Sequence, residues 1–468
     1  MRRIFAEDLR RILDEAKGAS YGEIRYHSRL LNEIRISKGE LERIRSVVND
    51  GVGIRVLVDG CWGFSSTSEM SNGSLLDTMR AALSSASLLS KGKQRKVSKL
   101  ADANLAVGTF KPPVNGKLED YSIEDKVKLV KDSEAYARKY SRKIRSASCT
   151  YRETIDHKII VNTDGASAEL FDSKPEFSIT AVAAESGNSV VGSEGIGITG
   201  GWKDLFSSKS AKDIAREAAQ KAVKLLKARQ PKGEKTTVIL DPGMVGLISH
   251  EAIGHTVEAD FVLSGSIVKD KIGQKVASDL VTLVDSGPSQ IQNFAAGTTF
   301  VDDEGVVATR TAIIDNGVLS SFLHNRETAS ILGAEPTGNA RAFEYDNEPL
   351  IRMRNTYIEP RDYAYEEIIK ETKHGYLIKG ARNGQADANG EFMFGSQEAY
   401  LIENGEIKQL LKGASISGRA FDVLMSVDAI GKDFKYDIGT GYCGKYQPMK
   451  VDGGGPHIRC TAIIGGVQ

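Results

Sequence analysis

Cysteine is scarce in this sequence, with four residues among 468, at Cys61, Cys149, Cys443 and Cys460. Such a small and scattered set does not suggest a disulfide framework, so a reducing, cytoplasmic setting is the simplest expectation. Long apolar runs are missing too. No stretch reaches the length of a membrane span, and the charged segment 1–17 lacks the apolar core of a signal peptide.

An excess of charge of either sign is also lacking. The 62 basic and 62 acidic residues give a formal net charge of +0, so there is no electrostatic case for nucleic acid or a membrane surface as a partner. Gly195-Ile196-Gly197 lacks the rest of a phosphate-binding fingerprint, which argues against a nucleotide site. With 468 residues, the chain is long enough for two or more domains.

Histidine is rare as well, but two of the seven histidines lie together in His250-Glu251-Ala252-Ile253-Gly254-His255. Two neutral imidazoles can bind zinc, and a carboxylate beside them can accept a proton from the water that the metal activates. The familiar zinc-protease pattern has three residues between its histidines. Here four intervene, which on a regular α-helix rotates His255 about 140° away from His250. A π-type wide turn realigns the two, and Gly254 has the backbone freedom to permit that turn or to end the helix.

The residues before this motif favour a buried helix. Ile239-Leu240 looks like the end of a strand, and Asp241 and Pro242 are typical of the N-cap and first position of a helix. Met244, Leu247 and Ile248 then form an apolar stripe. The motif is therefore expected on a packed helix, and it is a metal site only if that helix is distorted.

The remaining pattern predicts an α+β protein. Strands are expected at 23–27, 31–37, 41–48, 51–58 and 61–64, as an antiparallel meander with a turn at Asp59-Gly60. Long helices are expected at 72–91, 122–140 and 210–228, the second opened by a capping box at Ser122, and 93–115 is expected to be a connecting loop. The punctuated segment 227–235 divides an N-terminal α/β domain, 1–230, from a C-terminal domain, 236–468.

The C-terminal domain is expected to be β-rich and barrel-like, carrying the metal-motif helix. Strands are predicted at 236–240, 280–284, 309–314, 318–323 and 399–402, with hairpin turns at Asn316-Gly317 and Asn404-Gly405 and short helices at 365–372 and 417–425. The glycine-rich segment 451–455 is unsuited to a helix.

A zinc site needs at least one more protein ligand besides the two histidines. The candidates are Cys443, Cys460, His457, His324, His374, Glu258 and Asp260. Cys443 is flanked by glycines, and Lys445 would help to keep its thiol ionised. Spacing alone does not choose among these residues, and it leaves His324, Arg326 and Tyr400 as mere candidates for stabilising an oxyanion.

The sequence resembles the TldD/PmbA family of metallopeptidases, also described as modulators of DNA gyrase, over nearly its full length. The matching motifs are Gly51–Leu57, Trp62–Phe64, His250–His255, Pro336–Asn339, Asn355–Tyr357, Glu398–Gly405 and Cys443–Lys445. Because His250–His255 is intact, the chain resembles the catalytic, TldD-like branch rather than the TldE or PmbA branch.

The resemblance implies a zinc metalloprotease in which His250, His255 and Cys443 hold the metal, and Glu251 is the expected general base. It also implies unfolded or short peptides as substrates, cleaved in an interior cavity formed by a heterodimer with a TldE/PmbA-like paralogue, or by a homodimer if none exists. No substrate-binding residue is identified. The alternative is a peptide-binding or regulatory subunit whose metal is structural and four-coordinate.

Overall fold

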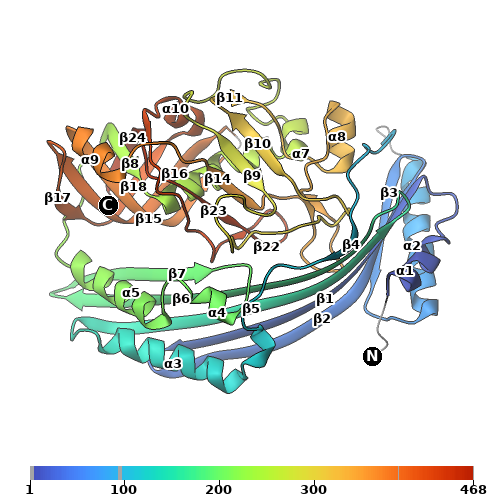
Figure 1. Cartoon of the computed structure of the whole chain (residues 1–468), viewed down its shortest axis with the longest axis horizontal. Helices are drawn as coiled ribbons and strands as arrows, with labels where there is room; N and C mark the ends of the chain where they lie inside the picture. Colours follow the sequence, from blue (N-terminus) through green and yellow to red (C-terminus); the bar gives the residue numbers. More distant parts are fainter. Residues whose placement is uncertain (1–4, 93–96, 388, 467–468) are drawn as a thin grey trace.

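The N-terminal half of the chain forms one long, curved sheet (Figure 1). A computed structural model describes residues 5–92, 97–387 and 389–466. The sheet has the strand order β3-β2-β1-β5-β6-β4, with β7 paired to β6, and it is antiparallel except for β4, which runs parallel to β6. Its strands are β1 (Tyr21–Ser37), β2 (Glu40–Val58), β3 (Cys61–Thr67), β4 (Val107–Phe110), β5 (Ile144–Asn162), β6 (Ser167–Glu185) and β7 (Asn188–Gly197).

The strands are longer than the sequence pattern predicts, because segments expected to be separate are continuous. The polar residues that seemed to interrupt them pair across the sheet instead: Ser28 of β1 donates a hydrogen bond of 2.6 Å to Asp50 of β2. The turn predicted at Asp59-Gly60 is confirmed, and both residues have the positive φ that a tight hairpin requires. The predicted loop 93–115 is wrong at Val107–Phe110, which forms the short strand β4, and its residues 93–96 lie outside the described residues.

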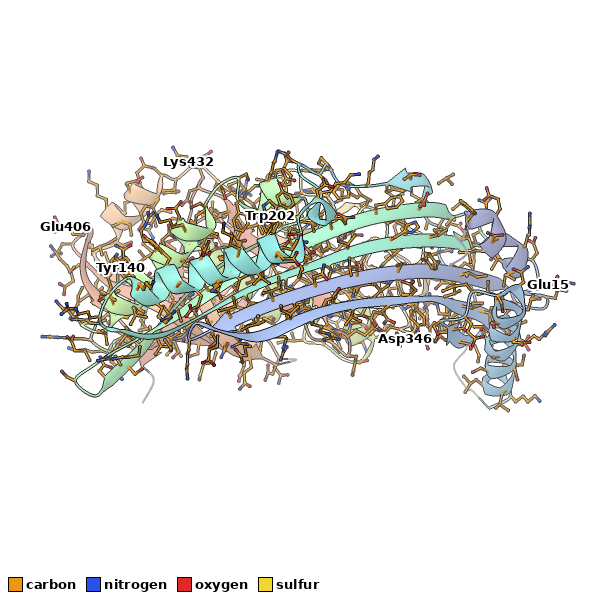
Figure 2. All side chains as sticks on the ribbon, turned by 90° about the horizontal axis from the view of Figure 1, so that it is seen from below. Glu15, Tyr140, Trp202, Asp346, Glu406 and Lys432 are labelled. Carbon is orange, nitrogen blue, oxygen red and sulfur yellow. The ribbon has the colours of Figure 1, made fainter. Side chains whose placement is uncertain are left out.

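Helices cover one face of the sheet (Figure 1). Figure 2 shows α3 lying along this outer face, with Tyr140 at its end. The capping box predicted at Ser122 is present, since its hydroxyl accepts from the Asp125 amide and the Asp125 carboxylate accepts from the Ser122 amide. The helices of this half are α1 (Ala6–Leu13), α2 (Asn72–Ser90), η1 (Leu118–Asp120), α3 (Ile123–Lys139), α4 (Trp202–Leu205) and α5 (Ala211–Leu225).

A closed barrel of five strands forms the centre of the C-terminal half. The pairing runs β15-β8-β24-β18-β16 and returns from β16 to β15, so the β-rich, barrel-like prediction is confirmed. Its core holds the apolar side chains of the segment after β8, which enters as the metal-motif helix. The barrel strands are β8 (Glu234–Leu240), β15 (His374–Ala386), β16 (Glu391–Glu403), β18 (Ala414–Arg419) and β24 (Ile458–Gly466).

A second sheet, in the order β11-β10-β9-β14-β23-β20, lies beside the barrel. Its strands are β9 (Leu283–Ser286), β10 (Arg310–Asp315), β11 (Val318–Leu319), β14 (Asn355–Ile358), β20 (Lys435–Tyr436) and β23 (Asp452–Gly455). The other elements are α6 (Pro242–Leu247), η2 (Ile248–Gly254), η3 (His255–Val257), α7 (Ala259–Leu263), α8 (Arg326–Leu332), β12 (Ala340–Arg341), β13 (Leu350–Ile351), α9 (Tyr365–Glu371), β17 (Glu406–Leu411), α10 (Ala420–Met425), β19 (Ala429–Ile430), β21 (Tyr442–Cys443) and β22 (Met449–Lys450).

Several local predictions for this half can be compared with the structure. The turns at Asn316-Gly317 and Asn404-Gly405 are present with positive φ. The strand expected at 318–323 ends at Leu319, and the helix expected at 417–425 begins only at Ala420 because the preceding residues belong to β18. Within the described ranges, no helix combines the length and the apolar character that a membrane crossing needs.

The C-terminal half lies against the concave face of the large sheet (Figure 1), and this contact is strongly polar. Arg29 donates two hydrogen bonds of 2.7 Å to Asp156, and Lys158 of β5 pairs with Asp303 at 2.7 Å. Gly51 and Gly53 of β2 allow Tyr345 to pack against the strand, since a Cβ on Gly51 would lie 2.2 Å from the Tyr345 ring. Several side chains buried between the large sheet and the C-terminal half are therefore charged, which bears on the cavity considered below.

Candidate metal centre

The metal-motif segment is the distorted helix that the histidine spacing requires. Asp241 caps its start, because one carboxylate oxygen accepts from the Met244 amide at 2.9 Å and the other from the Gly380 amide at 2.8 Å. The α-helical turns of α6 then widen into the π-helix η2 and tighten into the 3-10 turn η3. The rings of His250 and His255 consequently lie with centroids 5.3 Å apart and planes at 82°.

Gly254 has a different role from the one its flexibility suggests. Its φ of −55° and ψ of −45° are ordinary helical values, so the prediction that it supplies unusual backbone freedom is wrong. Space is the reason for glycine here: a Cβ at this position would lie 1.9 Å from the sulfur of Met353, which is fully buried. Through this contact, the wide turn packs directly against the segment that precedes β14.

Cys443 lies beside the two histidines although it is 188 residues away from His255 in the sequence. It belongs to the two-residue strand β21, which pairs with β22 so that Cys443 is opposite Met449. Its Sγ is 3.4 Å from Nε2 of His255. His250, His255 and Cys443 each contribute one donor atom, and these three atoms lie within 4.8 Å of one another. These three residues, the one such group among the described residues, are called the metal group below.

The other candidates for a third ligand have different partners. His457 pairs with Asp433, His374 is half-exposed near Glu234, and His324 contacts Thr328 through Nδ1. Cys460 is buried in β24, where burial raises the pKa of its thiol to about 12. Of the residues considered for stabilising an oxyanion, Arg326 binds Asp164 and Tyr400 binds Glu398.

Glu258 binds His255 from the side opposite Cys443. Its carboxylate accepts from Nδ1 of His255 at 2.9 Å and lies 3.2 Å from Nζ of Lys445. Glu258 is fully buried, and Lys445 also donates to Asp260 at 2.6 Å. The Lys445 ammonium thus serves these carboxylates, not the thiol as the sequence suggested. A carboxylate on Nδ1 leaves Nε2 free to face a metal.

Sequence reasoning considered Glu258 as a metal ligand and missed its role as the partner of His255. The i,i+3 spacing of Glu258 from His255 was the available signal, since side chains three apart on a helical turn are neighbours.

Without a metal, the thiol of Cys443 and the imidazole of His255 are expected to form an ion pair. Burial raises the pKa of the Cys443 thiol, but the charges of His250 and His255 outweigh it and lower the pKa to about 3. Burial lowers the pKa of His255, but its hydrogen bonds with Cys443 and Glu258 outweigh this and raise the pKa to about 10. A thiolate and two imidazoles are ligands that zinc prefers.

The group also contains buried ring nitrogens that have no hydrogen-bond partner, as expected of atoms that bind a metal. His250 is 2% exposed, yet neither of its ring nitrogens has a hydrogen-bond partner. Buried polar atoms without a partner are rare, and a role in binding an ion is one standard explanation. The donor set, its mutual distances and these two orphaned nitrogens are all compatible with a zinc ion.

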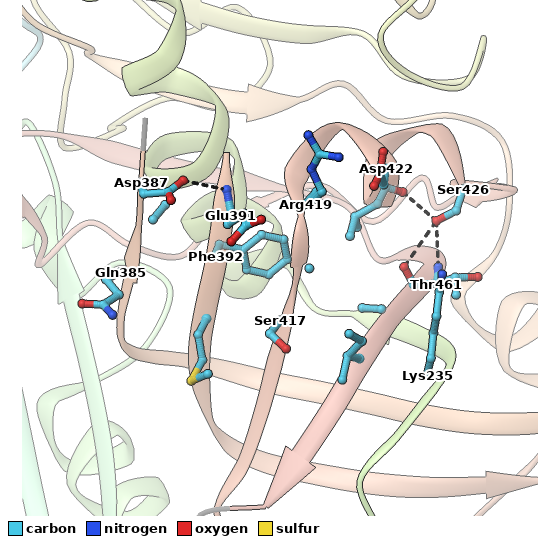
Figure 3. Close-up of a pocket in the computed structure, with 16 residues that line it drawn as sticks. Lys235, Gln385, Asp387, Glu391, Phe392, Ser417, Arg419, Asp422, Ser426 and Thr461 are labelled. Carbon is cyan, nitrogen blue, oxygen red and sulfur yellow. Dashed lines mark hydrogen bonds between the residues drawn. The ribbon is translucent and has the colours of Figure 1, made fainter. Parts of the chain in front are cut away.

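Glu251 lies at the open side of the group. Its carboxylate is 3.8 Å from Nε2 of His255, and its side chain is 37% exposed. A groove of about 960 Å³ lies elsewhere on the barrel, between Asp387 and Glu391 on one side and Arg419 and Asp422 on the other (Figure 3). That groove is not lined by any residue of the metal group, so it is not an enclosure around Glu251.

Comparison with known proteins covers almost the whole chain. Residues 22–86, 116–226 and 233–464 match the family models described as PmbA/TldA metallopeptidase domain 1, central domain and C-terminal domain. A metalloprotease of Methanocaldococcus jannaschii is 38% identical over 95% of this chain and 96% of its own length. A zinc metalloprotease TldD homolog of Saccharolobus solfataricus is 32% identical over 97% of this chain and 98% of its own.

A solved structure gives the same picture of the fold. TldE from Thermococcus kodakarensis superposes with a TM-score of 0.79, covering 98% of this chain and 100% of that one, at 18% sequence identity. At that identity the likeness concerns the fold alone.

Proposed function

Because the chain belongs to the PmbA/TldD metallopeptidase family, we propose that it is a zinc-dependent peptidase of TldD type with Glu251 as its general base. The observation that carries the proposal is the convergence of His250, His255 and Cys443 within 4.8 Å, with the Glu251 carboxylate next to them. This is the arrangement of a metal-binding group with an acid–base residue at its open side.

The chain's own residues have separable roles in this reaction. His250, His255 and Cys443 would hold the ion, which when bound polarises a peptide carbonyl and lowers the pKa of water. Glu251 accepts the proton of the attacking water and delivers it to the leaving amine. Glu258 holds the His255 ring by its Nδ1 atom, so that Nε2 keeps its direction.

The number of donors favours a catalytic metal over a structural one. Structural zinc sites are closed by four protein ligands, whereas catalytic sites have three and keep one position open. In the described part of the chain the group contains three. The exposed Glu251 lies on the side from which water and substrate would approach.

We expect extended peptides as substrates, bound through their main chain. The strand β15 pairs with β8 only at Tyr376–Ile378, so its edge at Ala381–Ala386 has a backbone ladder on the β16 side alone. The strand β15 contacts η2, which contains Glu251. An extended peptide can add to such an edge by main-chain hydrogen bonds, with little selection among side chains. Folded proteins lack a free strand to offer and would resist cleavage.

A second, related subunit would close the chamber that a single chain leaves open. The exposure of Glu251 is one sign of this opening. A contact surface for the second subunit is offered by the outer half of β2, because β3 pairs only with Val52–Val58. Leu41, Ile44 and Val48 are about half exposed along this free edge. Exposed apolar side chains on an unpaired edge are typical of a strand that another chain covers.

The test is Glu251→Gln, assayed for zinc content and for cleavage of an unfolded protein, with and without any TldE/PmbA-like paralogue from the same genome. We expect zinc to stay bound and cleavage to fall by at least about 100-fold, the lower end for a lost general base. Glu406→Gln, at an exposed position of β17, is the matched control and should cleave normally. Full cleavage by Glu251→Gln would disprove its role, and equal rates on the folded form of the same protein would disprove the substrate class.

A further inference from the structure

A second charged site lies behind the strand that carries Cys443. It is a cavity of about 60 Å³ between the concave face of the large sheet and the hairpin of β21 and β22. Tyr442 and Lys450, which pair with each other across that hairpin, form part of its wall. The space is large enough for a small polyatomic ion or a few water molecules.

Basic side chains outnumber acidic ones around this cavity. The six basic residues of its wall are Arg29, Arg152, Lys158, Lys174, Arg341 and Lys450. Four of them have a carboxylate partner: Arg29 pairs with Asp156, Lys158 with Asp303, Lys174 with Asp172, and Lys450 with Glu176. The Asp303 carboxylate is also 3.7 Å from Arg25, so it is shared between two cations.

Among the described residues, no carboxylate forms an ion pair with Arg152 or Arg341, although Glu176 faces the partly buried Arg152 across the β5–β6 ladder and is itself bound by Lys450. Arg152 of β5 stacks on the Tyr442 ring at 4.7 Å, and its buried Nε atom has no hydrogen-bond acceptor. Arg341 is 6% exposed and donates to the backbone oxygens of Met353 at 2.6 Å and Lys450 at 2.9 Å. Each guanidinium has five N–H donors, so both retain hydrogen atoms that could bind a further acceptor.

Uncompensated buried cations are costly. Moving a cation out of water without a counter-charge is strongly unfavourable, even after the surroundings relax. Burial, and after it the charge of Arg352, lower the pKa of Arg341 to about 10, although the more distant charges of Asp303 and Asp285 act in the opposite direction. An anion between the two guanidiniums would remove this cost, since guanidinium binds planar oxyanions through paired hydrogen bonds.

We propose that this cavity is a binding site for a small oxyanion, a carboxylate or a phosphate, with Arg152 and Arg341 as its charged donors. The site is distinct from the metal group, because Cys443 and Tyr442 are successive residues of one strand and their side chains point to opposite faces. It is nevertheless attached to the same hairpin through Tyr442 and Lys450. The anion would therefore hold the hairpin of Cys443 against the large sheet.

The test uses the full chain and inorganic phosphate as the probe. Binding is measured by titration calorimetry for the wild-type protein, Arg152→Met and Arg80→Met, where Arg80 is an exposed arginine of α2 and the matched control. We expect saturable binding that Arg152→Met weakens by about 10–100-fold, the loss for a hydrogen bond to a charged group, and that Arg80→Met leaves unchanged.

The source of the anion is distinguished with one peptide that has a free C-terminal carboxylate and the same peptide amidated. Displacement of phosphate by the free acid alone assigns the site to a peptide terminus, and displacement by neither assigns it to a free anion. Absence of saturable phosphate binding to the wild-type protein overturns the proposal. Equal binding by Arg152→Met also overturns it, since phosphate held by the metal would not depend on Arg152. These outcomes do not depend on peptidase activity.

Discussion

The buried contact between Glu258 and His255 permits a quantitative test of how the metal group is held. Substitution Glu258→Gln keeps the size of the side chain but removes the charge that faces Nδ1 of His255 at 2.9 Å and Lys445 at 3.2 Å. The amide can still offer an oxygen to Nδ1, although the nearby ammonium now competes for that oxygen. Loss of such an outer carboxylate typically costs 10–100-fold in metal affinity, which corresponds to about 1.4–2.7 kcal/mol.

Zinc affinity can be measured by competition with a coloured chelator, which requires no peptide cleavage. Asp260→Asn is the matched control, because Asp260 accepts from the same Lys445 at 2.6 Å but does not bind His255. We expect the control to stay within about threefold of wild type, since its carboxylate is 37% exposed and exposed ion pairs contribute little. Equal affinities for Glu258→Gln and wild type, or a larger loss in Asp260→Asn, would refute the role assigned to Glu258.

Three further predictions follow from the same geometry. Gly254→Ala should lower the free energy of unfolding by about 1–3 kcal/mol and weaken zinc binding, because the added Cβ meets Met353. The additional change Met353→Ala should restore zinc binding, and failure to do so would contradict a steric cause. In zinc-free protein, Cys443 should add stability that grows with pH from about 3 to 9, and His255 should contribute stability that is lost as pH rises from about 6.5 to 10. Urea midpoints of wild type relative to Cys443→Ser should therefore rise between pH 3 and 6.5, and a midpoint difference independent of pH there would oppose this assignment. Ile44→Glu should weaken assembly with a second subunit by at least about tenfold in sedimentation experiments while leaving zinc content unchanged, and undiminished assembly would exclude the β2 edge as the contact.

Local features of the metal-motif segment could be predicted because each depends on neighbouring residues. Four residues between His250 and His255 require a wide turn, and the structure contains a π-helix there. Asp241 caps the helix as its position before Pro242 indicated. Hairpin turns such as Asn404-Gly405 were equally accessible, since positive φ at both residues suits this pair.

Contacts between distant segments could not be read from the residues. Spacing gave no reason to choose Cys443 over Cys460 or His457, and only the resemblance to a known family favoured it. The ladder that brings β21 and β22 together has two residue pairs, too few to leave a periodic signal in the sequence. The role of Gly254 was misjudged for the same reason. It depends on contact with Met353, which lies far along the chain and is brought close only by tertiary packing.

The polar contact between the two halves was hidden by another ambiguity. Along β5, apolar side chains such as Cys149 and Tyr151 pack under the helices, and the alternate positions Arg152, Asp156 and Lys158 carry charge. Such alternation is the usual pattern of a sheet with one solvated face. Here the charged face is covered by the C-terminal half, and its charges are mostly neutralised in pairs. Hydrophobic periodicity reports which face is apolar, but not whether the polar face meets water.

The position of Cys443 depends on this buried polar region as well as on its own strand. A ladder of two residue pairs is marginal by itself. Arg352 compensates, because its guanidinium donates to the backbone oxygens of Cys443 in β21 and of Gln447 in the connecting loop, both at 2.6 Å. Arg341 holds the far arm by the oxygen of Lys450. The thiolate is thus fixed by arginines bound to main-chain oxygens, and this explains how a short hairpin can hold one donor within reach of two histidines on a rigid helix.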